Sequence, residues 1–155
     1  MRAIKVCSLI IGIAIISFDQ IIKFLVSTKV PDSGIFVLGS TIKIENVLNQ
    51  NIAFGFALPT ILVFVLILVA LVLISCLLMQ ARKQKQYFDS ILLSIMFYAA
   101  VSNLIDRIFL GGVVDYLSIT IYNLTWPTFN LADRLIVVAC IIFILNQFKS
   151  KNYAK

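Results

Sequence analysis

Four long apolar stretches dominate this chain, and each is about as long as a helix that crosses a lipid bilayer. They cover residues 6–26, 57–79, 87–107 and 131–148. A bilayer core about 30 Å thick needs roughly 20 helical residues. The second stretch contains no charged residue, which makes it the clearest of the four. The pattern predicts four transmembrane helices within a single domain that covers residues 1–155.

The segment between the first two apolar stretches has the shorter alternation that is typical of a β-hairpin. Ile35–Leu38 and Thr41–Glu45 flank Gly39 and Ser40. A glycine at the first position of such a two-residue connection favours a type II′ turn. Ser118–Tyr122 alternates in a similar way, so we expect it to join the same small sheet.

Basic residues cluster beside the apolar stretches, and their distribution predicts how the chain crosses the membrane. Eight of the 13 Lys and Arg residues lie near the termini or between the second and third stretches: Arg2, Lys5, Arg82, Lys83, Lys85, Lys149, Lys151 and Lys155. Cytoplasmic segments of membrane proteins are enriched in Lys and Arg. We therefore expect both termini in the cytoplasm and the loops 27–56 and 108–130 outside. The predicted fold is an all-α membrane protein with four transmembrane helices and a small extracytoplasmic β-sheet.

The composition agrees with lipid surroundings. Hydrophobic residues make up 61% of the chain and charged residues 13%, whereas soluble domains have about 45–50% and about 25%. The net charge of +6 arises from residues that flank apolar stretches, so it indicates membrane topology and not nucleic-acid binding. The first stretch contains an Asp and a Lys and lacks an A-x-A-like cleavage site, so we expect a retained helix and not a signal peptide.

The chain has no histidine, and each of its cysteines, Cys7, Cys76 and Cys140, lies within an apolar stretch. A Ser-His-Asp triad and an HExxH zinc site are therefore excluded. The spacing of the cysteines predicts neither a disulfide nor a zinc site. We expect the protein to use no metal and no cofactor.

Acidic residues are few, and six of the seven lie on the predicted outer side. Asp89 lies at the cytoplasmic edge. The other six are Asp19, Asp32, Glu45, Asp106, Asp115 and Asp133. An ionisable residue within a membrane costs about 2.5–3.5 kcal/mol on insertion scales, so such residues usually have a function.

Several polar residues have a simple structural explanation. Asp19 and Lys23 are four residues apart and share a helix face, so mutual neutralisation is expected. A polar network that stabilises helix packing is the simplest role for Asp106 and Arg107. Asn49, just before the second apolar stretch, is equally consistent with a helix cap or a tight turn.

Asp115 and Asp133 have no comparably simple structural explanation. Asp115 follows the flexible apolar segment 111–114 without a basic neighbour in sequence, and Asp133 lies at the start of the last stretch. If these outer ends pack together, two like charges meet and one pKa rises. Such a pair provides a base that activates water and an acid that protonates an amide leaving group. A proton relay or an ion site is equally consistent with the pair alone.

Four short motifs occur in order along residues 15–140: Asp19 with Lys23, Asn49–Phe54, Ser102–Arg107 with Val113–Tyr116, and Phe129–Asp133. They resemble the motifs of the lipoprotein signal peptidase (signal peptidase II) family. The family motifs are D-x-x-x-K, then N-x-G-x-A-F, then G-N-x-x-D-R followed by V-x-D-F/Y, and finally F-N-x-A-D. Each motif is short, but four in this order on a four-span chain are specific.

The resemblance implies a bacterial membrane aspartyl endopeptidase with Asp115 and Asp133 as its catalytic pair. The substrates would be diacylglyceryl-modified prolipoproteins, cleaved just before the lipid-modified cysteine. The resemblance also implies a polar shell formed by Asp19, Lys23, Asn49, Asn103, Asp106, Arg107 and Asn130. We expect a multi-pass monomer in the cytoplasmic (inner) membrane, surrounded by membrane lipid, with its active site at the outer face.

Three positions depart from the family motifs. Asn51 replaces a glycine, and Asn tolerates left-handed backbone angles better than most residues. Ser102 replaces the glycine before Asn103 and is still small enough for close helix approach. Arg134 directly follows the second aspartate, where a nearby cation would favour the ionised carboxylate.

A small proton- or ion-coupled transporter is the main alternative. Such transporters have inverted repeats with broken spans, which this sequence does not show, and they would be expected to place acids deeper in the membrane. A non-enzymatic membrane assembly subunit is a third option, and it would tolerate substitution of Asp115 and Asp133.

Overall fold

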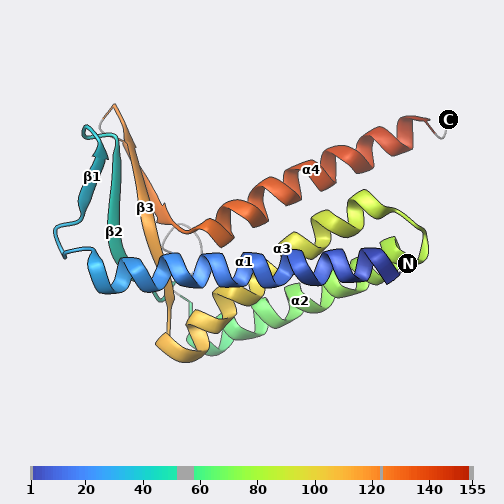
Figure 1. The fold of residues 1–155 in the computed structure, drawn as a ribbon, viewed down its shortest axis with the longest axis horizontal. Helices are drawn as coiled ribbons and strands as arrows, with labels where there is room; N and C mark the ends of the chain where they lie inside the picture. Colours follow the sequence, from blue (N-terminus) through green and yellow to red (C-terminus); the bar gives the residue numbers. More distant parts are fainter. Residues whose placement is uncertain (1, 52–57, 123, 154–155) are drawn as a thin grey trace.

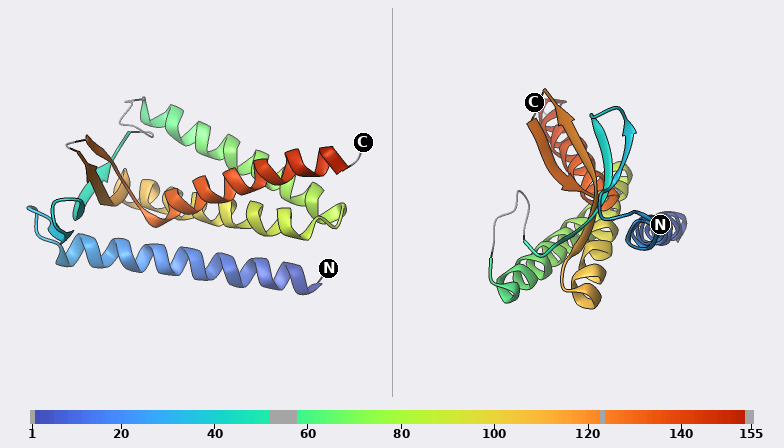
Figure 2. Two further views of the ribbon diagram at one scale, coloured as in Figure 1. Left: turned by 90° about the horizontal axis from the view of Figure 1, so that it is seen from above. Right: turned by 90° about the vertical axis from the view of Figure 1, so that its left-hand side faces the viewer.

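The computed structural model describes residues 2–51, 58–122 and 124–153, which form four long helices and one four-stranded sheet (Figure 1). The elements are, in chain order, α1 (Arg2–Lys29), β1 (Ile35–Leu38), β2 (Ile42–Asn49), α2 (Thr60–Lys83), α3 (Tyr87–Leu110), β3 (Val113–Ile121), β4 (Leu124–Phe129) and α4 (Leu131–Tyr153). The helices run side by side, and the strands gather at one end of them (Figure 2).

Each helix contains a segment that is long and apolar enough to cross a membrane. The four segments are Lys5–Lys29, Thr60–Lys83, Tyr87–Leu110 and Leu131–Lys149. The prediction of four apolar helices with a small sheet is therefore confirmed. The helices extend beyond the predicted apolar stretches because polar and basic residues at their ends continue the helical backbone. Residue 57, where the second stretch was predicted to begin, lies outside the described residues.

Helix α3 is the centre of the helical part, because α1, α2 and α4 all pack against it. The contact with α1 is close at Gly12: a Cβ atom on this glycine would lie 2.4 Å from the ring of Tyr98. The outward faces of the helices expose many large apolar side chains, among them Ile10, Val72 and Leu145. A surface of this kind is suited to lipid tails, which are as apolar as these side chains.

The sheet is antiparallel with the strand order β1-β2-β3-β4. The turn between β1 and β2 has the predicted glycine at its first position, since Gly39 has a φ of +52° and the N–H of Thr41 donates to the C=O of Leu38 at 3.0 Å. Three residues, Gly39–Thr41, separate the two strands, however, instead of the predicted two. The predicted strand at Ser118–Tyr122 also joins this sheet. However, β3 begins five residues earlier, at Val113, and it therefore includes Asp115.

Strand β4 (Leu124–Phe129) lies within the predicted outer loop 108–130 and pairs with β3, although the sequence pattern did not predict a strand at these residues. The alternation in this segment is weak, and Pro127 argues against a central strand. Proline is tolerated here because β4 lies at the edge of the sheet, where one side of the strand needs no backbone donor. The strand ends just before Asn130, so it fixes the point where α4 begins.

Candidate active site

Asp115 lies on β3 and is only 2% exposed. Each of its carboxylate oxygens accepts a hydrogen bond from a side-chain amide. Asn130 donates to Oδ1 at 2.7 Å, and Asn49, at the end of the neighbouring strand β2, donates to Oδ2 at 2.9 Å. Burial raises the pKa of Asp115 to about 6. The hydrogen bond from Asn49 opposes this rise, and the charge of Asp133 adds to it.

Asp133 lies in the first turn of α4 and borders the same cavity as Asp115. The side-chain amide of Asn103 on α3 donates to its Oδ1 at 2.7 Å. The backbone N–H of Asn130 lies 3.5 Å from its other oxygen, Oδ2. The sequence thus folds so that a strand, β3, and the start of a helix, α4, present two carboxylates to one space.

Asn130 connects the two aspartates. Its side-chain carbonyl accepts a hydrogen bond from the backbone N–H of Asp133 at 2.9 Å and so caps α4, while its amide group binds Asp115. Because Asp133 reaches back to the N–H of Asn130, the two residues form a reciprocal capping arrangement. With 1% of its surface exposed, Asn130 has little freedom to adopt another orientation.

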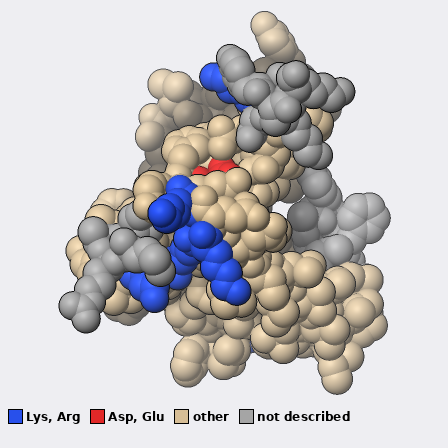
Figure 3. All heavy atoms as spheres, turned by 90° about the vertical axis from the view of Figure 1, so that its right-hand side faces the viewer, with Lys and Arg blue, Asp and Glu red and all other residues tan. Residues whose placement is uncertain are grey.

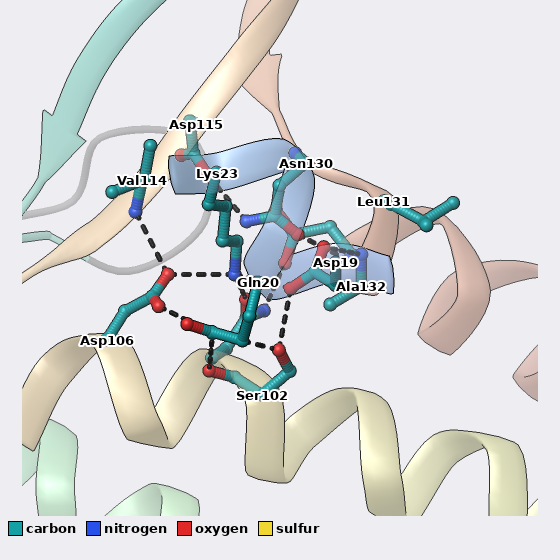
Figure 4. Close-up of polar contacts among 12 residues, drawn as sticks. Asp19, Gln20, Lys23, Ser102, Asp106, Val114, Asp115, Asn130, Leu131 and Ala132 are labelled. Carbon is teal, nitrogen blue, oxygen red and sulfur yellow. Dashed lines mark hydrogen bonds and ion pairs between the residues drawn. The ribbon is translucent and has the colours of Figure 1, made fainter. Parts of the chain in front are cut away.

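Lys23 is the centre of a second cluster beside this pair (Figure 4). Its ammonium group lies 2.7 Å from Asp19 and 2.8 Å from Asp106, and it donates to the side-chain oxygen of Asn103 at 2.8 Å. These three partners match the three donors of an ammonium group. Since Lys23 holds the oxygen of Asn103, the nitrogen of that amide is turned towards Asp133. The predicted pairing of Asp19 with Lys23 is correct, and the cluster also includes α3.

The remaining contacts of Asp19 and Asp106 tie this cluster to the ends of the neighbouring elements. Asp19 accepts from the backbone N–H of Ala132, at the start of α4, at 3.1 Å. Asp106 accepts from the N–H of Val114, on β3, at 3.2 Å. Both carboxylates are buried and bonded on each oxygen, so they hold the elements that carry the aspartate pair.

Sequence reasoning missed three residues of the site. The amide of Gln20 donates to Asp106 at 2.8 Å, and the hydroxyl of Ser102 donates to Asp19 at 2.7 Å. Tyr116 accepts a hydrogen bond from the N–H of Leu131 at 3.0 Å, and burial raises the pKa of its phenol to about 12. The signal available in the sequence was that Gln20 and Ser102 are neutral polar residues within apolar stretches. Ser102 was instead interpreted only as a small residue.

Asn49 and Arg107 hold the segment that leads away from β2. The side chain of Asn49 accepts a hydrogen bond from the N–H of Asn51 at 3.0 Å, which agrees with the predicted tight turn. It also donates to Asp115, a contact that the turn alone does not predict. Arg107 donates to the carbonyl of Asn51 at 2.7 Å. It forms no hydrogen bond to Asp106 among the described residues. The rest of the predicted Asn49–Phe54 motif, residues 52–54, lies outside the described residues.

The two aspartates open into a cavity of about 610 Å³. One apolar wall of the cavity comes from α2, and β4 and Arg134 form another part of its lining. The lining includes Val63, Leu66, Ile67, Ala70, Trp126, Pro127, Thr128, Phe129 and Arg134. The sequence suggested that Arg134 would favour ionised Asp133. Within the described part of the chain Arg134 forms no ion pair, and its guanidinium carbon lies 3.3 Å from the ring centre of Phe129.

Comparison with known proteins adds a family context to this geometry. Residues 11–149 match the family model described as Signal peptidase (SPase) II. Lipoprotein signal peptidases of Staphylococcus aureus strains JH9 and Newman are 27% identical over 149 residues, covering 96% of this chain and 91% of theirs. A solved bacterial membrane enzyme at 2.3 Å resolution has a TM-score of 0.79 and 25% identity, covering 96% of this chain and 92% of that one. A second, at 1.9 Å, has a TM-score of 0.77 and the same identity, covering 92% and 93%.

Proposed function

Because the chain belongs to the signal peptidase II family, we infer that it is a membrane aspartic endopeptidase that removes signal peptides from prolipoproteins, cleaving before the lipid-modified cysteine. We propose Asp115 and Asp133 as its catalytic pair. The observation that carries this proposal is the bridge formed by Asn130, which bonds to both residues at one cavity. The other two acids of the site, Asp19 and Asp106, are both paired with the ammonium group of Lys23.

The chemistry follows from two carboxylates that share one proton. The ionised carboxylate takes a proton from water, and the resulting hydroxide adds to the scissile carbonyl carbon. The protonated carboxyl gives its proton to the developing oxyanion, which yields a gem-diol intermediate. The two groups then exchange roles: the carboxyl that took the proton from water gives it to the leaving amine, and the other carboxylate removes a proton from a gem-diol hydroxyl as the C–N bond breaks. With a pKa of about 6, Asp115 is suited to exchange a proton near neutral pH.

The cavity wall supports a substrate that arrives from lipid. Val63, Leu66 and Ile67 of α2 form an apolar side to the space in front of the aspartates. An apolar signal helix fits this side, and its diacylglyceryl chains can stay in the bilayer while the scissile bond reaches the dyad. Water needed for hydrolysis then enters from the side of the sheet, where β3 and β4 lie.

The distribution of charge supports cytoplasmic termini and an active site at the outer face of the bacterial cytoplasmic membrane. The start of α1, the end of α4 and the turn between α2 and α3 lie at the end opposite the sheet (Figure 1). Lys and Arg side chains gather on that end (Figure 3). By the positive-inside rule this end is cytoplasmic, which leaves the sheet and the aspartates outside. We further propose that the protein acts as a monomer.

Cleavage of a synthetic diacylglyceryl-modified precursor by the purified protein tests the proposal. We expect wild type to release a product that begins at the lipid-modified cysteine. Asp115→Asn and Asp133→Asn should lose cleavage while keeping the wild-type melting profile. Asp32→Asn, in an exposed turn, is the matched control and should stay active. Full activity in either dyad variant would overturn the assignment. Ion flux in liposomes without precursor cleavage would support the transporter interpretation instead.

A further inference from the structure

Arg134 is a cationic residue of the cavity that neither the dyad nor the Lys23 cluster uses. It follows Asp133 on α4 and is half-buried. Within the described residues, its guanidinium group forms no ion pair and no hydrogen bond. The ring of Phe129 lies against this group, with the ring centre 3.3 Å from the guanidinium carbon. The five donors of this group are therefore left for a ligand.

The contrast with Arg107 makes this arrangement specific. Arg107 lines the same cavity, but its guanidinium binds backbone carbonyls of the segment after β2. Arg134 instead lies over an aromatic ring at cation–π distance, a contact that positions the guanidinium without using its N–H groups. A planar fork held in this way is prepared for a carboxylate, which it can bind through two parallel hydrogen bonds.

The charges around the cavity show why an anionic ligand needs this arginine. The Lys23 cluster contains two carboxylates and one ammonium, and the dyad with one shared proton has one negative charge. Arg107 and Arg134 together balance these two excess negative charges. Without Arg134 the site would be net negative, and an acidic group of the substrate would be repelled.

The position of Arg134 indicates which part of the substrate it meets. Side chains on a helix lean towards its N-terminus, and Arg134 leans towards Phe129, the last residue of β4. This is the sheet side of the dyad, whereas α2 supplies the apolar wall of the same cavity. If the proposed function holds, the signal helix occupies the apolar wall, and the chain that follows the lipid-modified cysteine passes the sheet side.

We propose that Arg134 is a specificity-determining residue that binds an Asp or Glu side chain of the substrate within the first few residues after the lipid-modified cysteine. This inference rests on the proposed function. The guanidinium pairs with the carboxylate, and Phe129 keeps it in place. Precursors with an acidic residue there are therefore cleaved more efficiently than their amide counterparts.

Two lipid-modified precursor peptides that differ only in Asp or Asn directly after the modified cysteine test the proposal. The readout is the ratio of kcat/KM for the two peptides. We expect wild type to favour the Asp peptide by about fivefold, as for one part-exposed ion pair. Arg134→Gln should abolish or invert this ratio, and Arg134→Glu should favour a third peptide with Lys at the same position. Lys29→Gln, an exposed charge at the end of α1, is the control and should keep the wild-type ratio.

The outcomes separate this inference from the function on which it rests. If wild type cleaves none of the peptides, the proposed function fails. If wild type cleaves them without preference, or if Arg134→Gln keeps the preference, only the role of Arg134 is overturned. The assay is run in phosphatidylcholine vesicles with and without phosphatidylglycerol. In one outcome, Arg134→Gln lowers kcat/KM equally for all peptides and only in vesicles with phosphatidylglycerol. That outcome would assign Arg134 to a lipid headgroup and overturn the proposal.

Discussion

Replacing Asn130 with alanine removes two different hydrogen bonds at once. The side-chain oxygen caps α4 by accepting from the N–H of Asp133 at 2.9 Å, and the side-chain nitrogen donates to Asp115 at 2.7 Å. The first contact belongs to helix stability and the second to the geometry of the dyad. The two effects can therefore be separated by choosing the replacement.

The expected magnitudes follow from the two contacts. Loss of an Asn helix cap costs about 1 kcal/mol of folding free energy. A hydrogen bond to a charged group contributes about 1.5–3 kcal/mol. If that contact is strongest in the transition state, its loss lowers kcat by roughly 10- to 100-fold. Asn130→Ala should therefore lower both the melting temperature and kcat.

Asn130→Ser is the matched variant for this experiment. A serine hydroxyl can accept from the N–H of Asp133 and keep the cap, but it is too short to cap α4 and also donate to Asp115. We expect the serine variant to recover most of the melting temperature in detergent while its kcat stays close to that of Asn130→Ala. Precursor cleavage under saturating substrate and thermal unfolding of the same samples give both quantities.

Two results would refute this reasoning. Wild-type kcat in Asn130→Ala, with a lowered melting temperature, would mean that Asn130 is only a helix cap. Recovery of both quantities in Asn130→Ser would mean that the bond to Asp115 does not contribute to catalysis.

Three further predictions concern the surroundings of the dyad and the opposite end of the bundle. The hydrogen bond from Asn49 favours ionised Asp115, so Asn49→Ala should raise the pKa of Asp115 above about 6. The alkaline limb of the pH–kcat/KM profile should then move to higher pH, and a limb that does not move would contradict this prediction. Lys23→Met leaves two buried carboxylates without their ion-pair partner and should destabilise the fold by about 3–5 kcal/mol, which would be measured as a much lower melting temperature. An unchanged melting temperature would show that the Lys23 cluster contributes little to stability. Asp89 accepts from two amides of α4 at the end far from the dyad, so Asp89→Ala should cost about 1–3 kcal/mol of stability without lowering kcat. A selective loss of kcat would contradict a purely structural role.

The helices could be predicted from sequence because the membrane imposes a length on them. An uncharged run such as residues 57–79 has few other structures open to it. Asp19 and Lys23 were also predictable as a pair, since a spacing of four brings them together on one helix without any knowledge of the fold.

The other contacts of the site depend on tertiary packing, and the sequence does not contain them in local form. Lys23 meets Asp106 and Asn103 because α1 packs against α3, and these two residues lie 83 and 80 positions further along the chain. The two contacts of Asn130 could not both be predicted either. Its spacing to Asp133 predicts a helix cap but gives no information about its hydrogen bond to Asp115. Strand β4 was missed because its own apolar–polar alternation is weak. It is held as a strand by its pairing with β3, which the local sequence does not show.

The central claim is that Asp115 and Asp133 act as one unit, and a double-variant comparison tests it most directly. The kcat of Asp115→Asn, of Asp133→Asn and of the protein with both substitutions is measured on the same lipid-modified precursor. Residues that act together in one chemical step are strongly non-additive. We predict that each single variant loses as much activity as the double variant. Losses that multiply in the double variant, or one single variant with wild-type kcat, would contradict the account.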